Sequence, residues 1–149
     1  MTTIAIFHSV LGLRSVEQDA AERFRSCGFE VAPPDLYAGK RTESIDEGFQ
    51  LMAEIRWRVI CGRALEAMTK LPDETILAGF SMGAGVISGL WCQRPESKAV
   101  LLFHGLAEVP SNVRTGLKVQ TPIASVDRFV SAEQGANAWR RAMNFVREL

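Results

Sequence analysis

Ala78-Gly79-Phe80-Ser81-Met82-Gly83-Ala84-Gly85 is the stretch around which this 149-residue chain is organised. A short apolar run precedes it, and a Gly- and Ala-rich segment that is typical of a helix start follows it. Its core has the form Gly-x-Ser-x-Gly, in which a strand turns sharply into a helix and leaves a hydroxyl exposed at the turn. The pattern predicts a strained backbone conformation at Ser81, which should be the only non-glycine residue nearby with such a conformation. It also predicts that Gly79 and Gly83 stand where a side chain would clash with the strand or the helix.

Two simpler interpretations compete with this nucleophile elbow. The stretch could be a plain connection from a strand to a helix, without chemistry. It could also be a phosphate-binding loop, but such a loop needs a Walker lysine or a Gly-x-Gly-x-x-Gly run, and the sequence has neither. The buried strand before the motif and the helix start after it favour the elbow.

Composition limits the class of protein. With 47% apolar and 23% charged residues, the chain suits a single domain over residues 1–149 with its own core. The formal net charge is zero and no basic run is present, so we expect no nucleic-acid partner. No apolar stretch is long enough to span a bilayer and no signal-like leader precedes the first strand, so we expect no membrane partner and no secretion.

The three cysteines are scattered along the chain. Cys27, Cys61 and Cys92 lack the spacing of metal ligands, and their number is odd. They suit a reducing compartment, and we expect a cytoplasmic protein that needs no metal and no other cofactor.

Apolar runs alternate with helix-like segments along the whole chain. Strands are expected at residues 3–8, 29–32, 75–78, 99–105 and 122–126. A first helix is expected to begin at Ser15, with Gln18 completing its N-terminal cap, and to end at Gly28. A second is expected over residues 44–71, with a bend or break at Gly62. Two more are expected, one directly after the elbow and one over residues 136–149. This alternation predicts an α/β fold, a three-layer sandwich with a mainly parallel five-stranded sheet in the order 2-1-3-4-5.

Four segments resemble the dienelactone hydrolase family of α/β-hydrolases, and together they cover almost the whole chain. Phe7-His8-Ser9-Val10-Leu11-Gly12-Leu13 resembles the first strand and the Gly-containing oxyanion loop of that family. Val31-Ala32-Pro33-Pro34-Asp35-Leu36-Tyr37 resembles its Ala-Pro-Asp-Leu-Tyr segment, with one extra proline. The stretch around Ser81 occupies the elbow, with serine where many relatives have cysteine, and Asp127-Arg128-Phe129-Val130 resembles the stretch that carries the acid.

This resemblance implies a hydrolase of small ester or lactone substrates that works through an acyl-Ser81 intermediate. It implies that Ser81 is the nucleophile and Asp127 the orienting acid. It also implies that the backbone N–H groups of Val10 and Met82 form the oxyanion hole.

The chain departs from the family pattern after Asp127. The family has a further strand there and then a Gly-His pair that supplies the base, but residues 129–135 are too few for both, and no histidine follows His104. We therefore expect that block to be absent. His104 is the possible substitute, because its strand is expected between those that end at Ser81 and at Asp127. His8, directly before the oxyanion loop, is expected to have a structural role.

A second hypothesis follows from the same departure. Without a base, the chain would be a catalytically silent relative that binds a small molecule or a partner chain. If the terminal strand is absent, the fifth strand is also an open edge, and open edges favour pairing between chains. We therefore expect self-association through that edge.

Overall fold

A five-stranded sheet forms the centre of the computed structural model, which describes residues 1–121 and 132–149. The strands are β1 (Thr3–Phe7), β2 (Glu30–Ala32), β3 (Ile76–Phe80), β4 (Ala99–Phe103) and β5 (Lys118–Gln120). Their order is β2-β1-β3-β4-β5, and all four pairings are parallel. The predicted α/β fold and strand order are therefore confirmed.

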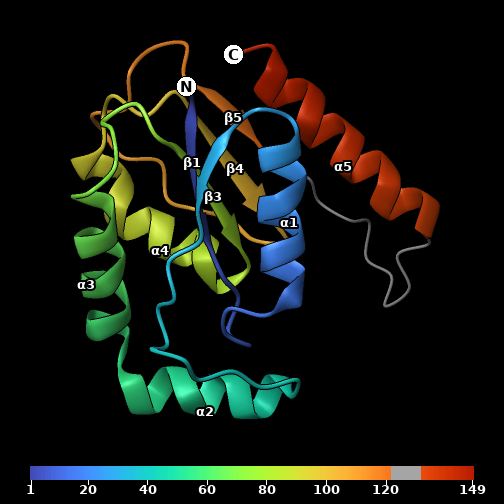
Figure 1. Cartoon of the computed structure of the whole chain (residues 1–149). Coiled ribbons are helices and arrows are strands. Elements are labelled where there is room, and N and C mark those ends of the chain that lie inside the picture. Colours follow the sequence, from blue (N-terminus) through green and yellow to red (C-terminus); the bar gives the residue numbers. More distant parts are fainter. Residues whose placement is uncertain (122–131) are drawn as a thin grey trace.

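Helices cover both faces of this sheet (Figure 1). On one face, α1 (Ser15–Ser26) and α5 (Ala132–Arg147) pack against alternate strand residues such as Ile4 and Ile6. On the other face, α3 (Trp57–Met68) and α4 (Met82–Leu90) pack against the intervening residues, such as Ala5 and Phe7. The strands are buried on both sides, as expected for a parallel sheet. A short 3-10 helix, Trp91–Gln93, follows α4.

Helix α2 (Ile45–Ile55) lies apart from these layers, beyond the carboxyl ends of the strands (Figure 1). Its N-cap is Ser44, whose hydroxyl accepts a hydrogen bond from the Glu47 amide. Gly48 is its one buried residue, and a Cβ there would lie 2.7 Å from the carbonyl oxygen of Val10. The missing side chain lets α2 pack closely against the loop after β1.

The helix predicted over residues 44–71 is broken at Arg56, not at Gly62. Arg56 has a φ of 79° and separates α2 from α3. Gly62 stays inside α3 because the helix buries Ile60, Ala64 and Met68 at four-residue steps on either side of it, while Gly62 itself is exposed. Tertiary burial here outweighs the low helix propensity of glycine.

The fifth strand lies earlier in the chain than predicted. β5 spans Lys118–Gln120 and pairs with the first three residues of β4, whereas the predicted strand, residues 122–126, lies outside the described residues. Lys118 and Val119 are both exposed, so the segment lacks the apolar run that marked the other strands. The predicted self-association through this edge stays a prediction.

Two helix starts also differ from the sequence-based expectation. Arg14, not Ser15, is the N-cap of α1, and its backbone amide donates to the carboxylate of Glu17 over 3.0 Å. The Glu17 side chain is itself buried. α5 is already helical at Ala132, four residues before the predicted start.

Glycines allow the close approach of β1, β3 and α4. A Cβ on Gly83 would lie 2.2 Å from the carbonyl oxygen of Phe7 in β1. A Cβ on Gly79 would lie 2.5 Å from the carbonyl carbon of Gly83. Both distances are far shorter than any real contact of a Cβ atom, so the two glycines are required on steric grounds, as predicted.

We predict that Gly83→Ala lowers the free energy of unfolding by about 3 kcal/mol, because backbone atoms of β1 or α4 must shift to admit the methyl group. Gly62→Ala is the matched control. Nothing lies within 4 Å of a Cβ at that helical position, so it should raise stability by about 0.5–1 kcal/mol. Urea denaturation followed by circular dichroism measures both changes. A Gly83→Ala protein as stable as the wild type would contradict the steric argument.

Candidate active site

Ser81 stands at the turn between β3 and α4. Its φ of 51° and ψ of −105° are strained for a residue with a side chain, and the residue is exposed. The predicted strain at Ser81 is therefore confirmed. The prediction that Ser81 is the only strained non-glycine residue nearby is wrong, because His104, at the end of the neighbouring strand, has a φ of 53°.

His104 lies next to the turn. The backbone amide of Ser81 donates to the carbonyl oxygen of Phe103 over 2.9 Å, and a Cβ on Gly105 would lie 3.0 Å from the carbonyl oxygen of Ser81. The His104 side chain is exposed, and no hydrogen bond joins its ring to Ser81 within residues 1–121. Asp127, the expected acid, lies outside the described residues. The structure thus brings the backbones of Ser81 and His104 together without forming the predicted contact.

The two amides assigned to the oxyanion hole come from separate elements. Met82 is the first residue of α4, and Val10 follows β1. Both side chains are buried in the same apolar cluster. Neither amide has a hydrogen-bond acceptor within the described part of the chain. The amide of Ala84, two residues after Met82, donates to the Ser81 carbonyl. The oxyanion role of both amides stays a prediction.

His8 is fully buried, and both of its ring nitrogens have partners. Nδ1 lies 2.8 Å from the carbonyl oxygen of Ser9, and Nε2 accepts a hydrogen bond from the Leu36 amide over 3.0 Å. These partners assign the neutral ring with its proton on Nδ1. Burial lowers the pKa of His8, against weaker opposing effects of the Ser9 hydrogen bond and the Asp35 carboxylate. The expected structural role of His8 agrees with this geometry.

The loop after β2, which His8 contacts at Leu36, also carries Tyr37, a residue for which the sequence predicted no role. Asp35 accepts hydrogen bonds from the amides of Tyr37 and Gly39, and the Tyr37 ring meets the His8 ring edge-on at 4.9 Å between centroids. The Tyr37 hydroxyl lies 3.3 Å from the sulfur of Met82 and 3.4 Å from the carbonyl oxygen of Gly48.

Tyr37 therefore joins the two sides of the elbow. It contacts Met82 directly, and it contacts α2 at Gly48, the residue that packs on the Val10 carbonyl. Burial raises the pKa of Tyr37 to about 12, so its hydroxyl stays a donor at neutral pH. The Ala-Pro-Asp-Leu-Tyr resemblance was the available signal, but only the folded chain shows what Tyr37 touches.

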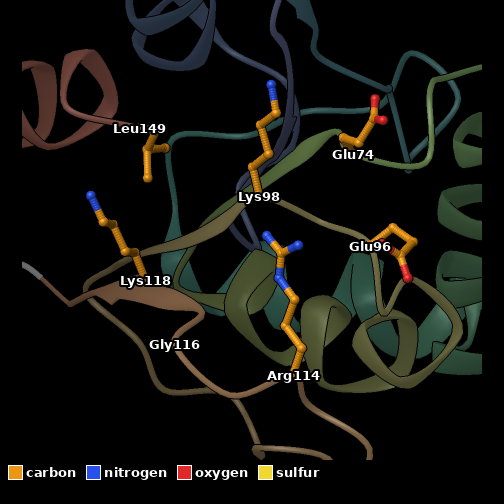
Figure 2. A pocket seen from close by; sticks show the side chains of 7 residues that line it. All are labelled: Glu74, Glu96, Lys98, Arg114, Gly116, Lys118 and Leu149. Carbon is orange, nitrogen blue, oxygen red and sulfur yellow. The ribbon is translucent and has the colours of Figure 1, made fainter.

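A charged cavity lies at the other end of the sheet (Figure 2). Its volume is about 400 Å³. It is lined by Glu74, Glu96, Lys98, Arg114, Gly116, Lys118 and Leu149. Glu74 precedes β3 and Lys98 precedes β4, so the cavity faces the amino ends of the strands, about 16 Å of strand away from Ser81. It plays no part in the elbow.

Two further findings concern metal ligands and membrane-spanning helices. Within residues 1–121 and 132–149, no three His, Cys, Asp or Glu side chains gather closely enough to hold a metal ion. In that same part of the chain, none of the helices combines the length and apolar character needed to cross a membrane.

Comparisons with known proteins agree with this arrangement. Residues 1–144 match the dienelactone hydrolase family. No significant match is found among curated proteins.

Solved structures show the same fold at low sequence identity. A Klebsiella pneumoniae protein assigned to the dienelactone hydrolases is 12% identical, with a TM-score of 0.73 over 100% of this chain and 88% of that protein. A dienelactone hydrolase-like promiscuous phosphotriesterase from metagenomic libraries is 22% identical, with a TM-score of 0.63 over 95% of this chain. The esterase PE8 is 17% identical, with a TM-score of 0.58 over 99% of this chain and 92% of PE8. The chain spans 65% of the length of the phosphotriesterase and of a similar structure, m3DLH.

The buried ring of His8 leads to a pH-dependence prediction. Its pKa is lowered in the folded chain, so its stabilising effect is complete above the unfolded pKa of about 6.5 and is lost as the pH falls below it. His8→Gln should lower the free energy of unfolding at pH 7.5 by about 1–3 kcal/mol, because one terminal amide group cannot pair with both the Ser9 carbonyl and the Leu36 amide. Its stability should then fall less steeply with acid than that of the wild type.

Tyr37→Phe is the matched control, since it changes the same cluster and leaves His8 in place. It should keep the wild-type slope between pH 7.5 and pH 5 in urea denaturation. If His8→Gln keeps that slope as well, the buried neutral His8 is not its source.

Proposed function

The chain belongs to the dienelactone hydrolase family of α/β-hydrolases, and we propose on that basis that it hydrolyses small ester or lactone substrates through an acyl intermediate on Ser81. One observation carries the proposal. Ser81 is strained and exposed at a strand-to-helix turn, directly before a helix whose first amide has no acceptor within the described residues. A serine held in this way has its hydroxyl beside donors that suit an oxyanion.

The proposed reaction has two steps on one residue. Ser81 Oγ attacks the substrate carbonyl, and the amides of Val10 and Met82 stabilise the negative charge that develops on the carbonyl oxygen. The bond to the leaving alkoxide then breaks, and the alkoxide takes up the proton that came from Ser81. Water next attacks the acyl-Ser81 ester, releasing the acid and restoring the hydroxyl.

His104 is the proposed base. His8 is excluded because it is buried with both nitrogens in hydrogen bonds, and the sequence has no other histidine. His104 is exposed and follows the strand that pairs with β3, so its ring can approach Ser81 Oγ by rotating or through one bridging water. Asp127 is proposed as the acid that orients it, as the family resemblance implies.

The setting of the protein is proposed from its cysteines. Cys27, Cys61 and Cys92 are free thiols, and the last is exposed. Unpaired thiols persist in a reducing compartment, so we place the protein in the cytoplasm.

Hydrolysis of p-nitrophenyl acetate tests the function. Ser81→Ala should lower kcat/KM to the uncatalysed background, and His104→Gly should lower it by about 10²–10⁴-fold. Glycine keeps the left-handed backbone at position 104 unstrained and leaves room for added imidazole, which should restore part of the activity above the rate of imidazole alone. Ser26→Ala, at the far end of α1, is the matched control and should keep wild-type activity.

Each outcome separates the hypotheses. Undiminished hydrolysis in Ser81→Ala would refute the acyl-Ser81 mechanism. Unchanged hydrolysis in His104→Gly would leave Ser81 as the nucleophile but remove His104 as the base. A wild-type protein that hydrolyses no activated ester would favour the silent relative that only binds.

A further inference from the structure

The Trp57 indole contacts α4 at Gly85, one helical turn after Ser81. Trp57 is the first residue of α3, and its indole atoms Cη2 and Cζ2 lie 3.3 Å and 3.6 Å from where a Cβ on Gly85 would stand. Gly85 follows Ser81 by four residues on α4, so the two positions share one side of the helix. A side chain at position 85 would be tight against the indole ring, so Gly85 favours this close contact.

The Trp57 side chain is partly open to solvent. Trp57 keeps 43% of its surface exposed although it contacts α4. The break at Arg56, with its φ of 79°, separates α3 from α2 directly before this ring. A large apolar side chain that is partly open to solvent, one helical turn after a candidate nucleophile, can serve as a contact for a ligand.

The loop after β4 provides a second boundary along α4. Gly105 approaches the first turn of the helix, where a Cβ would lie 2.8 Å from Ala84 Cβ, and the Glu108 amide donates to the Ser88 hydroxyl over 2.8 Å. Leu106, between these two contacts, is 75% exposed. The exposed Ser81, directly before α4, thus has the loop that carries Leu106 next to it and the Trp57 indole one turn further along the helix.

We propose that Trp57 binds the apolar group of an ester substrate held at Ser81, and that it makes the protein prefer substrates with long alkyl or aromatic groups over acetate-sized ones. The proposal rests on the proposed function, because it places the substrate by Ser81. The occupant follows from the chemistry of the surroundings. A flat apolar ring offers dispersion and burial of apolar surface, and both grow with the size of the alkyl or aromatic group.

Kinetics give the first test. Trp57→Ala should raise KM for p-nitrophenyl octanoate by about 10-fold or more, change KM for p-nitrophenyl acetate less than twofold, and leave kcat for acetate within about twofold. Trp57→Phe keeps a ring at the same place and should give an intermediate KM for octanoate. Equal changes of KM for both esters, or a loss of kcat alone, would overturn the proposal.

Binding without turnover gives the second test. Nuclear magnetic resonance is recorded on the Ser81→Ala variant, which cannot form the acyl intermediate. The indole N–H resonance of Trp57 is assigned by its absence when Trp57→Phe is added to that variant. Nonan-2-one, a ketone that contains the octanoyl group of the test ester, should shift this resonance in a saturable way, whereas butan-2-one should shift it far less. The buried Trp91 resonance serves as the internal control and should not move.

The two tests distinguish failure of the hydrolase function from failure of the apolar site at Trp57. If no ester is hydrolysed but nonan-2-one still shifts Trp57, the proposed hydrolase function fails and the apolar site stands. If esters are hydrolysed but Trp57 neither moves nor affects KM, the site is wrong and the hydrolase function stands. A Trp57 resonance that moves with protein concentration instead of ketone would identify a second copy of the chain as the occupant and overturn the proposal.

Discussion

The close contact between α4 and β1 is the constraint on which the rest of this structure depends. Gly83 lies against the carbonyl of Phe7 at a distance that excludes even a methyl group, and Gly79 lies against Gly83 in the same way. With these contacts, β3 ends and α4 begins within one residue, and that residue is Ser81. The strain of Ser81 is thus imposed by the packing of its neighbours and has no source in its own side chain.

The surroundings of the elbow are held by contacts between segments that are distant in sequence. His8, at the end of β1, fixes the loop that carries Asp35 and Tyr37. Tyr37 then reaches both Met82 on α4 and Gly48 on α2. A buried, neutral histidine and an un-ionised tyrosine satisfy this arrangement without placing a charge inside the protein. The network keeps α2 and α4 at fixed positions beside the strained serine.

The sequence predicted what local patterns determine. The Gly-x-Ser-x-Gly spacing located the turn, and the alternation of apolar runs with helical segments predicted the sheet and its strand order. It did not predict β5, because an exposed edge strand of three residues has no apolar run. It also placed the helix break at Gly62 instead of Arg56, since the burial of Ile60, Ala64 and Met68 in the apolar core is not visible in helix propensity.

The site was predictable to a smaller extent. Ser81 follows from its motif, but the contacts of Tyr37 and the approach of Trp57 to Gly85 join positions 45 and 28 residues apart. Such pairs depend on how α2, α3 and the loop after β2 pack on α4, which no local pattern encodes. The predicted strand order placed His104 next to Ser81, but how closely their backbones approach rests on the register of β3 against β4.

The central claim is that Ser81 carries the acyl group during turnover. The most direct measurement is mass spectrometry of the protein mixed with p-nitrophenyl butyrate and stopped in acid within its first turnovers. The account predicts that the butyryl group is found on the peptide that contains Ser81, in an amount that rises with p-nitrophenol release and then decays. Butyrylation of another residue alone, or steady release of p-nitrophenol without any acylated peptide, would contradict it.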